Sequence, residues 1–111
     1  MPAYMIFIRE DQVVDPVVLA AYSAANRANA ATFVERYGIK PLAVYGAMEV
    51  FEGDAPDGVI LLEFATTDDA RAWYGSPEYQ AAIPLRKLGA AYRAILVEGL
   101  DAPATARETT T

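Results

Sequence analysis

The sequence predicts an α+β domain built in the order strand, helix, strand, strand, helices, strand. Three observations support this prediction: short apolar segments bounded by polar turns, helical segments with apolar residues three and four apart, and a Ser, Thr or Asp before each helical segment. This order is the split βαβ, or ferredoxin-like, arrangement, in which helices cover one face of a four-stranded antiparallel sheet. A chain of 111 residues is large enough for one such domain, which we expect over residues 1–99.

Four segments have the composition of strands: residues 3–9, 42–51, 59–65 and 92–98. Gly46 in the second segment predicts a bulge or a sharp bend. The first, third and fourth segments are apolar on both faces, which is typical of strands that are covered on both sides. Since helices cover one face only, we expect the other face to pack against the same face of a second copy, in a homodimer whose two sheets form a barrel-like core.

The longest helical segment begins at Asp15, a side-chain cap, and Pro16, whose ring already has helical φ, and it ends at Gly38. Apolar and aromatic side chains follow one face of this segment, and Asn26 and Asn29 interrupt them. A helix of this length is unusual in a small domain, so we expect a bend near Asn29.

The second helical region contains a corner. Thr66 caps its first helix, and Gly75 predicts the end of that helix through the left-handed conformation. Ser76 caps the next helix, which leaves the corner at an angle. Beyond Pro84 the sequence predicts one more short helical turn, over residues 85–88.

The composition excludes several functions. With 9 basic and 15 acidic side chains the net charge is -6, which repels a nucleic-acid backbone. The chain has no Cys and no His, which removes disulfides, thiolate and Ser-His-Asp nucleophiles and the common metal ligands, so we expect no metal and no cofactor. No apolar run approaches the roughly 20 residues of a membrane span and no signal peptide is recognisable, so we expect a cytoplasmic protein. Residues 100–111 lose all pattern and predict a flexible tail.

Arg86 is the first candidate catalytic residue. A guanidinium near the corner can bind a carboxylate or an enolate through two parallel hydrogen bonds, and Ser76 adds a further donor. Arg86 paired with Glu78, as a brace for the corner, is the competing interpretation.

Glu63 is the second candidate catalytic residue, because it shares a strand face with apolar residues. A buried carboxylate has a raised pKa and serves as a general base unless a cation pairs with it. Arg9 or Arg93, on neighbouring strands, is a candidate partner, and an ion pair is the favoured interpretation of Glu63.

Aromatic side chains at the corner predict a wall for a planar ligand. We expect Trp73 in the core or at a dimer contact, and Tyr74 and Tyr79, together with Ser76 and Glu78, in contact with a ligand. Asn26 lies in an apolar helical stripe, where an amide without a partner costs about 1 to 3 kcal/mol, and Tyr22 lies one turn before it. A pocket, a helix bend or a bridging water each satisfies this amide, so Tyr22 and Asn26 are candidate ligand contacts.

The chain also resembles a known family. The most specific segments are Trp73-Tyr74, Ser76-Pro77-Glu78-Tyr79 and Pro84-Leu85-Arg86. They resemble the bacterial domain-of-unknown-function family 1330, of the dimeric α/β-barrel superfamily, and the resemblance extends over residues 3–99. It implies the same fold and homodimer and no established activity.

Two hypotheses of function follow. The first is a homodimer that holds a small organic acid or aromatic metabolite in a pocket of each subunit; the superfamily resemblance implies a cofactor-independent monooxygenase or isomerase of this kind. The second is a non-catalytic dimeric binding or stress-associated module, in which Arg86 and the aromatic residues only maintain the corner.

Overall fold

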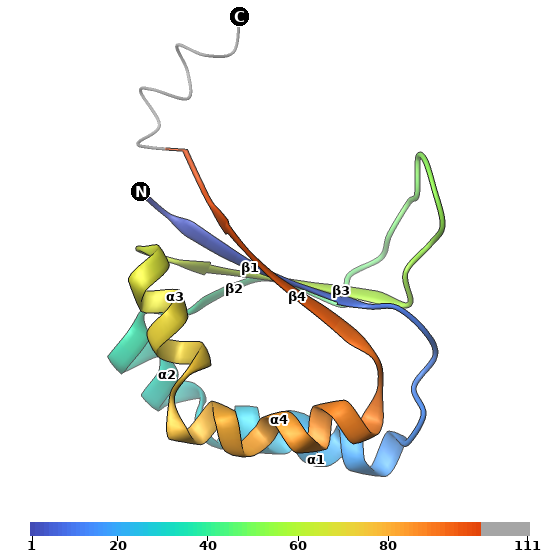
Figure 1. Cartoon of the computed structure of the whole chain (residues 1–111), viewed down its shortest axis with the longest axis horizontal. Helices are drawn as coiled ribbons and strands as arrows, with labels where there is room; N and C mark the ends of the chain where they lie inside the picture. The colour runs from blue at the N-terminus through green and yellow to red at the C-terminus, as the bar shows by residue number, and fades with distance from the viewer. Residues whose placement is uncertain (101–111) are drawn as a thin grey trace, which may run out of the picture.

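A computed structural model describes residues 1–100 of the chain, so the tail predicted for residues 100–111 lies outside the described residues from position 101 onward. The helices and strands follow one another along the chain in the expected order (Figure 1). They are β1 (Ala3–Arg9), α1 (Pro16–Ala28), α2 (Ala30–Tyr37), β2 (Lys40–Val44), β3 (Gly58–Phe64), α3 (Thr67–Tyr74), α4 (Pro77–Gly89) and β4 (Tyr92–Glu98). No helix within the described part of the chain is long and apolar enough to cross a membrane.

The strands form one antiparallel sheet in the order β2-β3-β1-β4, which confirms the predicted ferredoxin-like arrangement. The helices lie on one side of this sheet, and the connection between β2 and β3 extends away from them on the other side (Figure 1). Register decides which side chains face the helices. Phe7 lies opposite Ile60 on β3 and Ala94 on β4, on the helix side, whereas Ile6 lies opposite Leu61 and Ile95 on the outer side.

An aromatic cluster fills the space between the sheet and the helices. Trp73 of α3 is at its centre, 3% exposed, with its ring 4.2 Å from the Tyr79 ring and 5.6 Å from the Phe64 ring, measured between centroids. Phe7 and Phe33 meet the same indole edge-on, each at 6.1 Å. Such pairs contribute about 0.5 to 1.5 kcal/mol each beyond their buried area. Trp73 is therefore a core residue, as its sequence context predicts.

The predicted helix caps are present. Asp15 accepts hydrogen bonds from the backbone N–H groups of Val17 and Val18, and the Ser76 hydroxyl accepts from the Tyr79 N–H. Gly38 ends α2 in the left-handed conformation, at φ 65°. The long helical segment is interrupted at Asn29, where α1 ends and α2 begins, which confirms the predicted bend.

Three local predictions are wrong. The second strand ends at Val44 instead of residue 51, because Tyr45 turns the chain with a φ of 52°. Gly75 has a right-handed conformation, so α3 passes into the corner without a left-handed residue. The segment after Pro84 is no separate turn, because α4 continues through the proline from Pro77 to Gly89.

Candidate functional site

A cavity of about 480 Å³ lies between helices α1 and α2 and the sheet. Its walls are mainly apolar, and the apolar lining residues include Phe7, Phe33, Val34, Ile60, Leu62 and Trp73. Two buried polar atoms of lining residues, Asn26 Oδ1 and Trp73 Nε1, have no hydrogen-bond partner within the described residues 1–100. Apolar walls with a few unsatisfied polar groups are typical of a site for a small molecule.

A chain of hydrogen bonds links this cavity to a buried arginine. Arg86 Nη1 donates to the Tyr79 hydroxyl over 3.2 Å, and the Tyr79 hydroxyl lies 2.7 Å from the hydroxyl of Tyr22. Tyr22 lines the cavity, whereas Tyr79 is completely buried behind it. The residues Arg86, Tyr79 and Tyr22 are called the buried chain below.

Helix packing brings the three residues of the buried chain together. Tyr79 and Arg86 are seven positions apart in α4, which places them on the same face two turns apart. Tyr22 lies on the buried face of α1, and α1 approaches α4 closely at Gly89. A Cβ atom on Gly89 would lie 2.8 Å from the Leu19 Cβ, so only glycine permits this approach.

Arg86 is only 6% exposed as a residue, and within residues 1–100 no carboxylate pairs with its guanidinium. Its neighbours are instead the ring faces of Phe7 and Tyr92, whose centroids lie 5.5 Å and 6.0 Å from its Cζ. Burial raises the pKa of Tyr79 well above its ordinary range, although Arg86 acts in the opposite direction. Tyr79 therefore keeps its proton and can donate a hydrogen bond.

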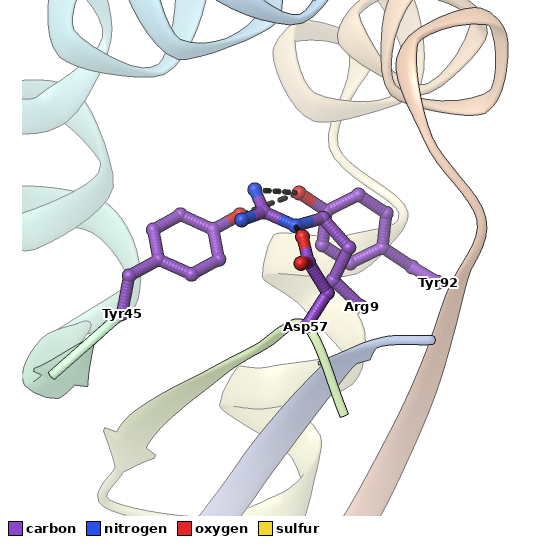
Figure 2. Close-up of polar contacts among 4 residues, drawn as sticks. All are labelled: Arg9, Tyr45, Asp57 and Tyr92. Carbon is purple, nitrogen blue, oxygen red and sulfur yellow. Dashed lines mark hydrogen bonds and ion pairs between the residues drawn. The ribbon is translucent and has the colours of Figure 1, made fainter. Parts of the chain in front are cut away.

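A second arginine and two tyrosines form a similar chain at the end of the sheet (Figure 2). Arg9 Nη1 donates to the Tyr92 hydroxyl over 3.5 Å, and the Tyr92 and Tyr45 hydroxyls are 2.5 Å apart. Tyr45 lines the same cavity as Tyr22. Unlike Arg86, Arg9 has a carboxylate partner: its Nε donates to Asp57 Oδ2 over 2.6 Å. Arg9, Tyr92, Tyr45 and Asp57 are called the outer cluster below.

Backbone geometry holds Tyr45 in the outer cluster. Its positive φ is rare for a residue with a side chain and turns its ring over Arg9, whose Cζ lies 4.5 Å from the ring centroid. Gly58 leaves the space for this ring, since a Cβ there would lie 2.6 Å from Tyr45 Cδ1. Burial, followed by the hydrogen bond with Tyr92, raises the pKa of Tyr45, so this hydroxyl also stays protonated.

The structure brings some of the predicted site residues together. Arg86 and Tyr79 form the buried chain with Tyr22, and Asn26 lies in the cavity wall beside them. The brace between Arg86 and Glu78 is absent, because Glu78 pairs with Arg36 across 3.4 Å.

The remaining candidates lie outside the cavity. Ser76 is buried in the corner, where its hydroxyl donates to the Trp73 carbonyl and accepts from the Tyr79 N–H. Tyr74 lines a separate hollow of about 340 Å³ beside α3. Glu63 is opposite Tyr4 of β1 and therefore lies on the outer face of the sheet, away from Arg86.

The suggested partners of Glu63 pair with other acids. Arg9 binds Asp57, and Arg93 binds Glu10. Within residues 1–100 no three His, Cys, Asp or Glu side chains are grouped so that they could hold a metal ion. The described polar groups that remain for chemistry at the cavity are hydroxyl, amide, indole N–H and guanidinium.

The sequence analysis missed the outer cluster, although a signal for part of it exists. Arg9 ends the first strand and Tyr92 begins the last, so antiparallel pairing of the two strands puts them opposite each other, as the register shows. No such signal exists for Tyr45 and Asp57. Both residues lie in the irregular connection between β2 and β3, where strand pairing does not fix their positions.

Solved structures of other proteins share this fold. A protein of unknown function from Rhodopseudomonas palustris aligns with a TM-score of 0.62 at 20% identity, covering 91% of this chain and 84% of that chain. A dimeric ferredoxin-like protein of unknown function from Thermobifida fusca aligns with 0.58 at 18% identity, covering 87% and 90%. SnoaB, a cofactor-independent oxygenase from Streptomyces nogalater, aligns with 0.53 at 11% identity, covering 92% and 95%. At these identities the likeness shows the fold alone.

None of the curated proteins matches this sequence. A family model does match, and it covers nearly all of the described residues. The family resemblance inferred from the Trp-Tyr, Ser-Pro-Glu-Tyr and Pro-Leu-Arg segments is thereby confirmed. The chain belongs to the domain-of-unknown-function family DUF1330, whose model matches residues 2–100.

Proposed function

We propose that this protein binds a small aromatic metabolite or organic acid in the cavity between α1, α2 and the sheet, and that it acts as a homodimer. The cavity is the observation that supports the proposal. Its volume of about 480 Å³ is in the range of small-molecule sites, and its apolar wall favours a planar or aliphatic ligand. Asn26 Oδ1 and Trp73 Nε1, two buried atoms of lining residues, have no hydrogen-bond partner within residues 1–100, so a small shift of either side chain would bring a polar group to a ligand.

The intrinsic fluorescence of the protein provides a direct test of binding. Trp73 is the only tryptophan of the chain and belongs to the cavity wall, so an occupant changes its emission. Titration with planar aromatic compounds, phenols, quinones, lactones and small carboxylates is expected to give a saturable change for at least one class. A ligand at 100 times its dissociation constant should also stabilise the fold by about 2.7 kcal/mol in a thermal-shift assay.

A matched pair of variants locates the binding site. Ala30 and Ala31 of α2 are both exposed, but only Ala30 is among the residues that line the cavity. Ala30→Phe should fill the cavity and abolish binding, and Ala31→Phe should leave it unchanged. Equal binding by both variants would exclude this cavity, and no saturable change with any class would favour the non-catalytic dimeric module.

The outer face of the sheet supports the homodimer. The helices leave this face uncovered, and it carries apolar side chains, including Ile95 and Val97 at 39% and 43% exposure. Solved structures of the same fold are described as dimeric. Burying the same face of a second copy removes this apolar surface from water.

A charge on that face tests the homodimer. Ile95→Glu places a carboxylate on the outer face, and it should shift the mass measured by light scattering from dimer to monomer. Val17→Glu is the control, because Val17 is 78% exposed on α1, away from the sheet. A monomeric wild-type protein at micromolar concentration would contradict the proposal.

A further inference from the structure

We propose that the Tyr22 hydroxyl is the group of the cavity that recognises an oxyanion, and that its ligand is an ionised phenol or enol whose charge is stabilised by Arg86 acting through Tyr79. This inference rests on the proposed function, because it requires a ligand in the cavity. It differs from direct binding by Arg86, since Arg86 is not among the residues that line the cavity.

The direction of the hydrogen bonds supports this role. A guanidinium has donors only, so the Tyr79 oxygen accepts from Arg86 and the Tyr79 O–H is free to donate to Tyr22. The O–H of Tyr22 is then the end of the chain, and Tyr22 is the member that lines the cavity. Each bond in such a chain polarises the next, so Tyr22 is a stronger donor than an isolated tyrosine.

The charge of Arg86 supports the oxyanion rather than a neutral oxygen. A buried cation without a carboxylate is costly, and within residues 1–100 the neighbours of Arg86 are the hydroxyls of Tyr79 and Tyr74 and the aromatic faces of Phe7 and Tyr92. An anion at the Tyr22 hydroxyl is separated from the guanidinium by two hydroxyl groups, and water screens an attraction through buried groups less than it screens one at the surface. The ligand then supplies the negative charge that the protein lacks at this point.

Other ionisable groups at the cavity are few. Tyr22 and Arg27 come from α1 and Tyr45 follows β2, while the lining residues from α2, β1, β3 and α3 have no ionisable side chain. Arg27 is an exposed residue, so water and salt screen its charge. Tyr45 belongs to the outer cluster, where Asp57 neutralises Arg9. Both groups are therefore suitable controls.

The pKa of a bound phenol measures the proposed interaction directly. An apolar cavity by itself disfavours the charged form and raises the pKa of a phenol, whereas a strong donor at the phenol oxygen lowers it. The two effects have opposite signs. The direction of the shift therefore distinguishes a cavity that merely holds the ligand from one that stabilises its oxyanion.

The experiment uses two probes of similar size with the wild-type protein. 4-Nitro-1-naphthol changes colour when it ionises, and 1-methyl-4-nitronaphthalene lacks the ionisable group. Both should quench Trp73 fluorescence saturably. The pKa of the bound naphthol, read from its absorbance against pH, should be at least about one unit lower than in water. Such a shift means that the ionised naphthol binds roughly tenfold more tightly than the neutral naphthol.

Substitutions assign the effect to the buried chain. Tyr22→Phe keeps the ring and should reverse the shift, so that the bound naphthol has a higher pKa than in water, while the methyl probe still binds. Tyr45→Phe removes a hydroxyl from the same cavity, and Arg27→Gln removes the exposed cation; both should leave the lowered pKa in place. Retained binding of the methyl probe also shows that each variant is folded.

The outcomes separate this inference from the proposed function. If the methyl probe binds and the pKa of bound naphthol is unchanged or raised in the wild-type protein, the cavity function stands and the oxyanion role of Tyr22 is wrong. The same conclusion follows if Arg27→Gln or Tyr45→Phe, and not Tyr22→Phe, removes the shift. If neither probe binds, the oxyanion role of Tyr22 is rejected, whereas the proposed function is rejected only if the titration with the other ligand classes also gives no saturable change.

Discussion

The buried chain and the outer cluster are built from the same parts and differ in their surroundings. Each runs from an arginine through one tyrosine to a second tyrosine in the cavity wall. Arg86 is 6% exposed and has no carboxylate partner within residues 1–100, whereas Arg9 is bound to Asp57. The comparison teaches that the same set of one arginine and two tyrosines can have different electrostatic effects on a cavity. A carboxylate beside the arginine, such as Asp57 beside Arg9, cancels the positive charge that the tyrosines would otherwise transmit.

The largest expected difference is in stability. Tyr79→Phe removes the hydroxyl between Arg86 and Tyr22 and leaves a buried donor and a buried hydroxyl without partners, so the free energy of unfolding should fall by about 1 to 3 kcal/mol. Tyr92→Phe makes the same change in the outer cluster, where water replaces the lost partner, and should cost less than about 1 kcal/mol.

Urea unfolding at one protein concentration measures both variants, since a homodimer's midpoint depends on concentration. Equal losses of stability in the two variants would mean that the buried chain and the outer cluster do not differ in their access to water.

An intermediate effect is expected from removing the carboxylate of the outer cluster. Asp57→Asn leaves Arg9 without its neutralising partner, so the second cation should now act on the cavity through Tyr92 and Tyr45. Affinity for the ionised naphthol should rise by about fivefold, which corresponds to about 1 kcal/mol at a partly exposed site.

Fluorescence titration at a pH where the probe is fully ionised checks this value. The gain should disappear in the double variant Asp57→Asn with Tyr45→Phe, and a gain that survives there would show that Arg9 does not act through Tyr45.

The smallest effect is expected from crowding the outer cluster. Gly58→Ala puts a Cβ atom 2.6 Å from Tyr45 Cδ1, so the ring must move away from Arg9. The loss should be only about 0.5 to 1 kcal/mol, because Tyr45 is 39% exposed and alanine recovers part of the entropy cost of glycine.

Gly46→Ala is the matched control, since its Cβ would meet nothing within 4 Å. Urea unfolding should show this control at or above wild-type stability, and the pKa of bound naphthol should be the same in both variants. If the pKa of bound naphthol changed in Gly58→Ala alone, the outer cluster and the buried chain would be coupled through the cavity.

Local sequence signals predicted the fold well because caps and strand faces act over a few residues. Asp15, Gly38 and Ser76 end or begin helices through groups that lie next to them in sequence. Tyr45 shows where such signals stop, since its positive φ ends β2 early although the apolar pattern continues to Phe51. That pattern had indicated a longer strand, and the exposed apolar residues beyond Val44 account for the error.

The candidate site was predictable only in part. The repeat of four residues identified Tyr22 and Asn26 as members of one helix face, and Arg86 was expected at the corner. The contact of Tyr22 with Tyr79 joins residues 57 positions apart, and no local signal specifies it. Glu63 stays a prediction, because register places it on the outer face of the sheet, away from the cavity, where the proposed second copy would cover it.

The cavity and the buried charge come from different stretches of the polypeptide. Most of the wall is contributed by residues between Phe7 and Tyr45, whereas Arg86 and Tyr79 both belong to α4, near the end of the domain. Mutations in the first half of the gene, other than at Tyr22, can therefore change the size and shape of an accepted ligand while Arg86 and Tyr79, which support the proposed preference for a negative charge, stay unchanged. A family built in this way can diversify its ligands without redesigning the chemistry that recognises them.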